Sequence, residues 1–264
     1  MSAYGVKRYL QYRLRAGNEH SIHSPFVFKL YTEVIRNKEK YYAYDELDKL
    51  RVRLLKDPTI LEVTDLGAGS KKLNKKRAVS DMAGVSVAPR KYGELLFRLV
   101  NYFKPQNILE LGTSLGLSAL YMHKAAPAAA LTTVEGCPNT AAFAAAFTNF
   151  PIKEKDRPGG PIIRNTSFSH YLTNEISGQT FDFIYLDGNH TYEATINYFQ
   201  ILLSHINASS VMIFDDIYWS AGMTKAWEEI KLHPSVTVTI DLFKLGLVFF
   251  RKENKQKEDF ILRY

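Results

Sequence analysis

Apolar residues recur at helical spacing in four segments of the first hundred residues. Residues 4–14, 25–35, 44–55 and 89–103 carry apolar side chains at every third or fourth position, and each segment predicts an amphipathic helix. Ser24 followed by Pro25 fits an N-cap with proline in the first helical turn. Residues 61–86 contain glycines and lysines without a clear period, and they predict a long loop.

The pattern changes near residue 107, where short apolar runs begin to alternate with helical segments. This alternation is typical of a mostly parallel sheet with helices on both faces. The last two strands are separated only by the residues around 241–244, too few for a crossover helix, so these strands should be antiparallel neighbours. The predicted strands are residues 108–111, 131–134, 162–164, 183–186, 211–214, 236–240 and 247–251. The predicted helices are residues 117–126, 140–150, 168–176, 191–206 and 223–232.

These elements predict an α/β protein with a Rossmann-like, seven-stranded, mostly parallel sheet that ends in a C-terminal antiparallel β-hairpin. The α/β domain should span residues 89–264. Residues 1–88 should form an N-terminal helical extension with a basic loop. By its position, this extension is expected to cover the active site or to make a dimer contact.

The composition indicates a folded protein and excludes several classes. Of the 264 residues, 46% are hydrophobic, so a sizeable core can be buried. Cys137 is the single cysteine, which rules out a disulfide within the chain and argues against a cysteine-based zinc site. The first residues lack the apolar core of a signal peptide, and no apolar run approaches the roughly 20 residues of a membrane helix. We therefore expect a cytoplasmic protein without a membrane partner.

The net charge of +7 raises the question of a nucleic-acid partner. The basic residues are scattered, apart from clusters at 7–15, 71–77 and 251–257, and we interpret them as solvated surface and loop. Residues 63–70 contain a glycine-rich stretch of the kind found in nucleotide-binding loops. The basic run 71–77 follows this stretch in place of an apolar helix. A basic loop is predicted there, suited to act as a lid over the substrate.

The strongest motif follows the first predicted strand. The strand ends at Leu111, and Gly112 and Gly116 then allow the backbone to turn and to approach a ligand closely. A dinucleotide site has the spacing G-x-G-x-x-G, whereas Ser114 and Leu117 stand here at the second and third glycine positions. The spacing Glu-x-Gly-x-x-x-Gly instead resembles the first motif of S-adenosylmethionine-dependent methyltransferases. An ordinary tight turn between strand and helix is the alternative.

This resemblance implies S-adenosylmethionine as the cofactor. The cofactor carries a sulfonium and an ammonium group, so a carboxylate at Glu110 is favourable. Glu135 ends the next strand, where an acidic residue can accept hydrogen bonds from both ribose hydroxyls, although it could also be a surface carboxylate. The expected cofactor-binding residues are Glu110, Gly112, Thr113, Ser114, Gly116, Ser118, Glu135, Gly136, Thr166, Ser167 and Asp187, with Thr166 and Ser167 beside the adenine.

Acidic side chains follow the fourth and fifth predicted strands. Asp187 comes after the fourth strand, and Asp215 and Asp216 come after the fifth. Parallel neighbouring strands end at the same edge of a sheet, so these three carboxylates should converge. Clustered carboxylates repel one another unless a cation or proton intervenes, and Mg²⁺ suits such oxygen ligands. Capping and loop hydrogen bonds are the alternative role.

Residues 92–251 resemble class I methyltransferases of the catechol O-methyltransferase-like group, and the Asp-Gly-Asn-His-Thr-Tyr stretch resembles its bacterial small-molecule branch. In metal-dependent members the ligands are an Asp after the fourth strand and an Asp-Asn pair after the fifth. The resemblance implies Asp187, Asp215 and Asp216 as ligands of Mg²⁺ or another divalent cation, with Asp216 replacing the Asn. The family's catalytic lysine is replaced by His190, so His190 with Asp187 is the candidate catalytic pair.

The sequence therefore predicts O-methylation of a small-molecule acceptor, with or without metal assistance, by an enzyme that could be a homodimer. An RNA methyltransferase is one alternative. The residues after the fourth strand are Asp-Gly-Asn-His, however, and not the Asn/Asp-Pro-Pro-Tyr of enzymes that methylate base amino groups. A non-catalytic binding module with the same fold is the other alternative. A nicotinamide-dependent oxidoreductase is disfavoured by the missing middle glycine and by the final hairpin.

Overall fold

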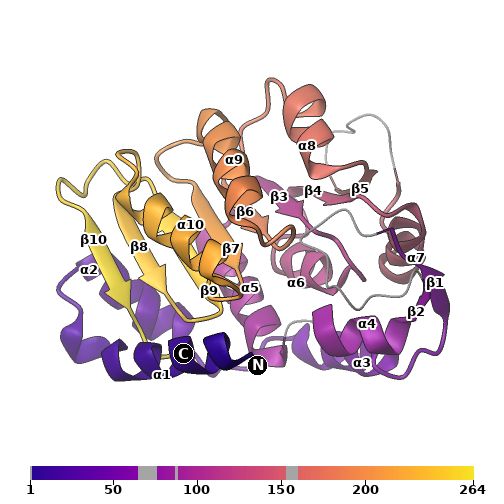
Figure 1. Cartoon of the computed structure of the whole chain (residues 1–264), viewed down its shortest axis with the longest axis horizontal. Helices are drawn as coiled ribbons and strands as arrows, with labels where there is room; N and C mark the ends of the chain where they lie inside the picture. Colours follow the sequence, from indigo (N-terminus) through magenta and orange to yellow (C-terminus); the bar gives the residue numbers. More distant parts are fainter. Residues whose placement is uncertain (1, 65–75, 87–88, 153–159) are drawn as a thin grey trace. The chain divides into compact units, whose positions relative to one another are not determined.

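The computed structural model describes residues 2–64, 76–86, 89–152 and 160–264. The chain forms two compact units, which are coloured by sequence in Figure 1. We call Lys38–Ile176 the central unit, and Met1–Asn37 together with Ser177–Tyr264 the terminal unit. The predicted domain boundary at residue 88 falls inside the central unit. Both units contain strands and helices, and most strand pairs that the structure describes between residues 107 and 261 are parallel. This agrees with the α/β class that the sequence predicts.

Three parallel strands form the sheet of the central unit, in the order β3 (Asn107–Leu111), β4 (Ala130–Glu135) and β5 (Pro161–Asn165). Four of the five residues of β3 are buried, as are the four inner residues of β4. Such continuous apolar runs are typical of parallel strands that are covered on both faces. The connecting helices are α6 (Leu117–Ala125) and α7 (Pro138–Thr148), and α5 (Arg90–Phe103) precedes β3.

The rest of the central unit differs in part from the prediction. Helix α3 (Tyr44–Leu54) is where the sequence places it, and α8 (Phe168–His170) continues into the π-helical turn η3 (Tyr171–Glu175). The predicted loop at 61–86 is wrong at both ends, because β1 (Ile60–Glu62) and β2 (Lys76–Ala78) form an antiparallel pair and α4 (Val79–Ser86) follows. Residues 65–75, with most of the predicted basic lid, lie outside the described residues.

The sheet of the terminal unit has five strands among the described residues, in the order β6, β7, β9, β8 and β10. The parallel pair is β6 (Phe183–Leu186) and β7 (Val211–Asp215), and β9 (Leu245–Phe249) lies antiparallel between β7 and β8 (Val238–Asp241). The predicted hairpin is therefore confirmed. The strand β10 (Glu258–Ile261) pairs parallel to β8 and was not predicted. The helices after β6 and β7 are α9 (Tyr192–Leu202), with the 3-10 turn η4 (Leu203–His205), and α10 (Ala221–Leu232).

The N-terminal helices of the terminal unit pack beside its last strand, as the indigo and yellow segments in Figure 1 show. They are α1 (Ala3–Arg15), the 3-10 turn η1 (Glu19–Ser21), α2 (Pro25–Leu30) and the π-helical turn η2 (Tyr31–Ile35). The Tyr12 hydroxyl donates to the Leu262 carbonyl at 2.6 Å. The Gly17 amide donates to the Ile261 carbonyl at 2.9 Å, and its carbonyl accepts from the Arg263 amide at 3.0 Å. These hydrogen bonds join the N-terminal segment of the unit to the end of β10.

Across the described ranges, no helix has the length and apolar character needed to cross a lipid bilayer.

A substitution of Gly116 can test how tightly the loop after β3 packs against α7. Gly116 is the N-cap of α6 with φ 84°, and a Cβ at this position would lie 2.5 Å from Thr148 Cγ2 on α7. Gly116→Ala adds left-handed backbone strain and a steric contact, so we expect it to lower the free energy of unfolding by about 2–3 kcal/mol. Urea denaturation measures this change.

Gly178 provides the matched control, because its φ is 76° and no atom lies within 4 Å of an added Cβ. Gly178→Ala should cost only the backbone strain of about 1 kcal/mol. Equal losses in the two variants would contradict the packing of Gly116 against α7.

Candidate functional site

The loop after β3 is held against the end of β4. The amides of Gly112 and Thr113 both donate to the Val134 carbonyl, at 3.0 and 3.2 Å, and the Gly116 amide donates to the Thr113 carbonyl at 2.8 Å. Gly112 and Gly116 have φ values of 112° and 84°, which only glycine adopts without strain. Ser114 has φ 47°. A serine in this left-handed region needs compensating interactions.

Glu135 at the end of β4 supplies that compensation. Its Oε2 accepts a hydrogen bond from the Ser114 amide at 2.9 Å, and its Oε1 accepts one from the Cys137 amide at 2.9 Å. Burial raises the pKa of Glu135, while the amides of Cys137, Ser114 and Gly136 counteract this by stabilising the carboxylate. Each carboxylate oxygen has a second lone pair. Glu135 can therefore fix the loop and still accept a hydrogen bond from a ligand hydroxyl.

Glu110 lies behind the same loop and is completely enclosed, with 0% of its surface exposed. Its Oε2 accepts a hydrogen bond from the Thr133 hydroxyl at 2.5 Å, and the hydroxyls of Thr133 and Thr113 are 2.6 Å apart. Burial raises the pKa of Glu110 to about 7, although hydrogen bonds from Ser118 and Thr133 favour its charged form. Its Oε1 is buried without a hydrogen-bond partner among the described residues.

The enclosure of Glu110 differs from the expectation that its carboxylate faces the charges of the cofactor. A side chain that solvent cannot reach does not contact a ligand in this conformation. Glu110 is instead hydrogen-bonded to Thr133 on β4, and the Thr133 hydroxyl is hydrogen-bonded to the Thr113 hydroxyl in the loop. In this structure Glu110 supports the loop from inside.

The end of β5 adds polar groups beside Glu135. The Thr166 amide donates to the Glu135 carbonyl at 3.1 Å, and Asn165 Nδ2 donates to the same carbonyl at 2.8 Å. The Ser167 hydroxyl accepts from the His170 amide at 3.2 Å, and so it caps the short helix α8. The structure thus brings Thr166 to the Glu135 backbone and gives Ser167 a capping contact.

A contact that the sequence did not suggest joins the β1–β2 pair to the start of α7. The Thr64 amide donates to Cys137 Sγ at 3.3 Å, and Asn139 Nδ2 donates to the Glu62 carbonyl at 2.9 Å. Cys137 is also the residue whose amide donates to Glu135. The end of β1 therefore lies close to the carboxylate that fixes the loop.

In the terminal unit, a lysine lies between two of the predicted metal ligands. Lys244 Nζ is 3.0 Å from Asp215 Oδ2 and 2.9 Å from Asp216 Oδ1. Lys244 immediately precedes β9, and the antiparallel register places Leu245 opposite Asp215. The turn of the hairpin thus brings the lysine to the carboxyl end of β7.

Lys244 and the three aspartates Asp187, Asp215 and Asp216 form a charged cluster, in which neighbouring charges affect the pKa values of Lys244 and Asp215. Burial lowers the pKa of Lys244, but Asp215, Asp216 and Asp187 more than offset this and hold it well above its ordinary value. Burial and the negative charges of Asp187 and Asp216 raise the pKa of Asp215, while Lys244 and His190 oppose the rise. The side chain of Asp215 is 3% exposed, so the ammonium group compensates a carboxylate that water barely reaches.

The predicted catalytic pair forms beside this cluster. His190 Nε2 is 3.6 Å from Asp187 Oδ1, and the Tyr185 hydroxyl donates to Asp187 Oδ2 at 3.3 Å. The side chains of His190 and Asp187 are 20% and 21% exposed, so a ligand can reach them. The exposed Trp219 ring lies 6.3 Å from the His190 ring, centroid to centroid.

The residues predicted to bind a divalent metal do not fit one as they stand. Within the part of the chain that the structure describes, no group of three or more His, Cys, Asp or Glu residues could hold a metal ion. Asp215 and Asp216 each direct one oxygen to Lys244 instead, and Asp215 Oδ1 is buried without a hydrogen-bond partner among the described residues. Lys244 is not among the residues predicted from the sequence. The short connection between the last two predicted strands, next to the fifth strand, is the sequence signal that points toward it.

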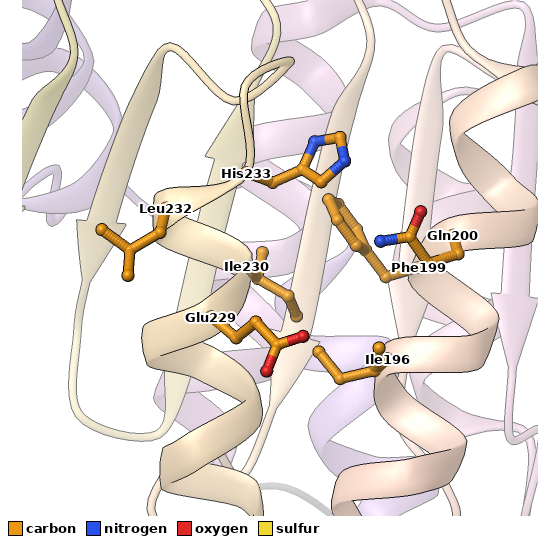
Figure 2. A pocket seen from close by; sticks show the side chains of 7 residues that line it. All are labelled: Ile196, Phe199, Gln200, Glu229, Ile230, Leu232 and His233. Atoms are coloured by element: carbon orange, nitrogen blue, oxygen red, sulfur yellow. The ribbon is translucent and has the colours of Figure 1, made fainter.

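A hollow elsewhere in the terminal unit is separate from these residues. It has a volume of about 200 Å³ and lies between α9 and the last turn of α10 (Figure 2). No predicted site residue lines it. The side chains around it are Ile196, Phe199, Gln200, Glu229, Ile230, Leu232 and His233.

Comparison with known proteins identifies the fold. Residues 109–217 match the family model of a methyltransferase domain. The chain has the methyltransferase fold. The matched residues begin within β3, extend through β7 and include all the predicted site residues, but they end before Lys244. No curated protein matches the chain.

Solved structures of low sequence identity share this methyltransferase fold. The methyltransferase PaMTH1 of Podospora anserina, bound to S-adenosylhomocysteine (SAH), has a TM-score of 0.56 and 15% identity over 88% of this chain and 97% of that one. An O-methyltransferase of Bacillus cereus in complex with SAH has a TM-score of 0.54 and 16% identity, over 85% and 97%. The O-methyltransferase TomG of Streptomyces achromogenes, in complex with S-adenosylmethionine and involved in tomaymycin synthesis, has a TM-score of 0.53 and 15% identity, over 85% and 95%.

The buried Glu110 makes stability depend on pH. Its pKa is raised from 4.5 to about 7 in the folded state, so its protonated form contributes stability that is fully present below about pH 4.5. This contribution is lost as the pH rises through 7. Glu110→Gln is neutral at every pH, so between pH 4.5 and 8 its unfolding free energy should rise by about 3 kcal/mol relative to the wild type.

Urea denaturation of both proteins across this pH range measures the difference. A constant offset in place of a changing one would contradict the raised pKa of Glu110.

Proposed function

We propose that the protein transfers a methyl group from S-adenosylmethionine to an oxygen atom of a small-molecule acceptor. The observation that carries this proposal is the clamp between Glu135 and Ser114 in a loop that matches a methyltransferase domain. Two solved neighbours of the same fold are described as O-methyltransferases, one in complex with SAH and one with S-adenosylmethionine. They support the same reaction class for this chain.

The cofactor would bind at the ends of β3, β4 and β5. Glu135 would accept hydrogen bonds from the ribose hydroxyls through its remaining lone pairs. Glu110 would act from behind the loop, through Thr133. The proposed binding residues at this end are Gly112, Thr113, Ser114, Gly116, Ser118, Glu135, Gly136, Thr166 and Ser167.

Methyl transfer needs an acceptor oxygen with an available lone pair. The oxygen attacks the methyl carbon, the bond from that carbon to sulfur breaks, and SAH leaves with the electron pair on sulfur. His190 would take the proton of the acceptor hydroxyl. Asp187, at 3.6 Å from His190 Nε2, would orient the ring and stabilise its protonated form. Holding the two reactants in line would provide much of the rate enhancement.

Divalent metal assistance, expected from the resemblance, is not part of this proposal. Two of the three predicted ligands already pair with Lys244. The homodimer stays a prediction. Such a dimer would cover exposed apolar side chains of α1, among them Val6, Leu10 and Leu14.

Glu135 provides the test of the cofactor site. Wild-type protein should bind SAH in isothermal titration calorimetry. Glu135→Ala should weaken this binding at least about 100-fold, because it removes charge-assisted hydrogen bonds worth about 1.5–3 kcal/mol each. Glu46→Ala, which removes an exposed glutamate of the same unit that pairs with Lys124, should leave the affinity unchanged. Absence of SAH binding by the wild type, or equal binding by Glu135→Ala, would refute the cofactor assignment.

His190 provides the test of catalysis. SAH production on a panel of small phenols and alcohols should identify an acceptor, and His190→Gln should lower kcat by about 10²–10⁴-fold. The affinity for SAH should not change, because His190 acts on the acceptor. His170→Gln, which alters an exposed histidine of the central unit, should keep wild-type kcat. Full activity of His190→Gln would remove His190 as the base, and SAH binding without turnover of any acceptor would favour the non-catalytic binding module.

A further inference from the structure

We infer that Lys244 is a built-in cation that replaces a divalent metal between Asp215 and Asp216. Its ammonium group compensates these carboxylates and leaves one N–H to hold an oxygen of the acceptor. The second part rests on the proposed function, whereas the replacement of the metal can be tested without turnover.

The ammonium group of Lys244 lies close to two of the three carboxylates that were predicted to bind a metal. One oxygen of Asp215 and one of Asp216 lie 3.0 and 2.9 Å from its Nζ. Mg²⁺ requires oxygen ligands at about 2.0–2.1 Å in near-octahedral geometry. A divalent ion bound by the same two carboxylates would therefore have to displace the ammonium group or lie close to its positive charge. Both alternatives are unfavourable, so Lys244 should exclude the metal.

The turn that carries Lys244 is firmly held. Phe243 has φ 70°, and its amide donates to Asp241 Oδ1 at 2.7 Å. Asp241 also accepts the Tyr218 hydroxyl. The Phe243 ring packs against Tyr9 and Tyr12 of α1, with ring centroids 5.0 and 5.3 Å apart. The lysine therefore extends from an ordered turn, and it has a defined position for its amine.

A second lysine of the same unit shows what is special about Lys244. Lys231 also contacts two carboxylates, with Nζ 2.9 Å from Glu228 Oε2 and 3.0 Å from Asp259 Oδ2. Those two carboxylates are 50% and 46% exposed, so water can solvate them without the lysine. Asp215 is 3% exposed and depends on a local cation.

The geometry also leaves Lys244 a role toward the acceptor. An ammonium group has three N–H donors. Among the described residues, two carboxylates engage Lys244, and its side chain remains 20% exposed. The remaining donor can bind an acceptor oxygen, which is the orienting role that a metal ion performs in metal-assisted transfer. Lys244 would then be a positioning residue, and proton removal would stay with His190.

The test uses Mn²⁺ as the probe, with electron paramagnetic resonance of the full-length protein without cofactor. The wild type should bind Mn²⁺ no better than an exposed carboxylate pair does. Lys244→Ala opens the space between Asp215 and Asp216, so it should bind Mn²⁺ at least about tenfold more tightly than the wild type. Adding Asp215→Asn to this variant should abolish the gain. Lys244→Arg keeps the positive charge and should resemble the wild type.

Lys231→Ala is the matched control, because it removes a lysine from between two exposed carboxylates. An equal gain of Mn²⁺ affinity in Lys231→Ala and Lys244→Ala would overturn the inference. It would also be overturned by tight wild-type binding that Asp215→Asn removes, or by a folded Lys244→Ala variant that gains no affinity. Circular dichroism reports folding, and the wild-type and Lys244→Arg measurements decide the question if Lys244→Ala does not fold.

The activity measurement separates this inference from the proposed function. If an acceptor is found, EDTA should leave kcat unchanged, and Lys244→Ala should raise KM for the acceptor without changing the affinity for SAH. EDTA inhibition that added Mg²⁺ reverses would overturn the inference while the methyltransferase assignment stands. Failure to bind SAH would refute the proposed function, but it would not alter the Mn²⁺ result.

Discussion

Buried acids at the carboxyl ends of the strands require compensation, and the local structure around each acid depends on how the acid receives it. Burial disfavours a carboxylate unless hydrogen bonds or an opposite charge stabilise it. Glu110 on β3 accepts hydroxyl hydrogen bonds and has a raised pKa. Glu135 on β4 accepts two backbone amides, and Asp215 on β7 pairs with an ammonium group. As a result, Glu110 supports the loop after β3 from behind, Glu135 holds the loop in place, and Asp215 forms an ion pair with Lys244.

The strands that the sequence predicts well are those with a continuous apolar run. The inner parts of β3, β4, β6 and β7 are almost wholly buried, and the central positions of such strands contain few charged residues. The strands β1, β2 and β10 have only three or four residues each, and charged residues such as Lys76, Glu258 and Asp259 are part of them. Such short, partly charged segments show no apolar run, so the pattern of hydrophobic residues does not indicate them. The association of residues 2–37 with the C-terminal strands depends on contacts that are distant in sequence, and no local pattern indicates it.

The site was predictable where position along a strand determines it. Glu135 follows a buried strand directly, and its place at the strand end suffices to bring it to the loop after β3. Burial is harder to foresee, since Glu110 lies one residue before the end of its strand and extends into the interior. For Lys244, the short connection between the last two strands indicates its approximate place, but the antiparallel register of β9 against β7 decides which residues it contacts. A sequence gives the presence of that pairing more readily than its alignment.

The hydrogen bonds between residues 12–17 and 261–263 have a consequence for how the protein is made. The terminal unit consists of two stretches separated by the 139 residues of the central unit, from 38 to 176. During synthesis, the first stretch leaves the ribosome long before its partner strand β10 exists. Until β10 is made, α1 has no surface of the terminal strands to pack against. Contacts over such sequence separations slow folding. The central unit can acquire its core earlier, and the turn beneath Lys244 should be among the last parts of the protein to become ordered.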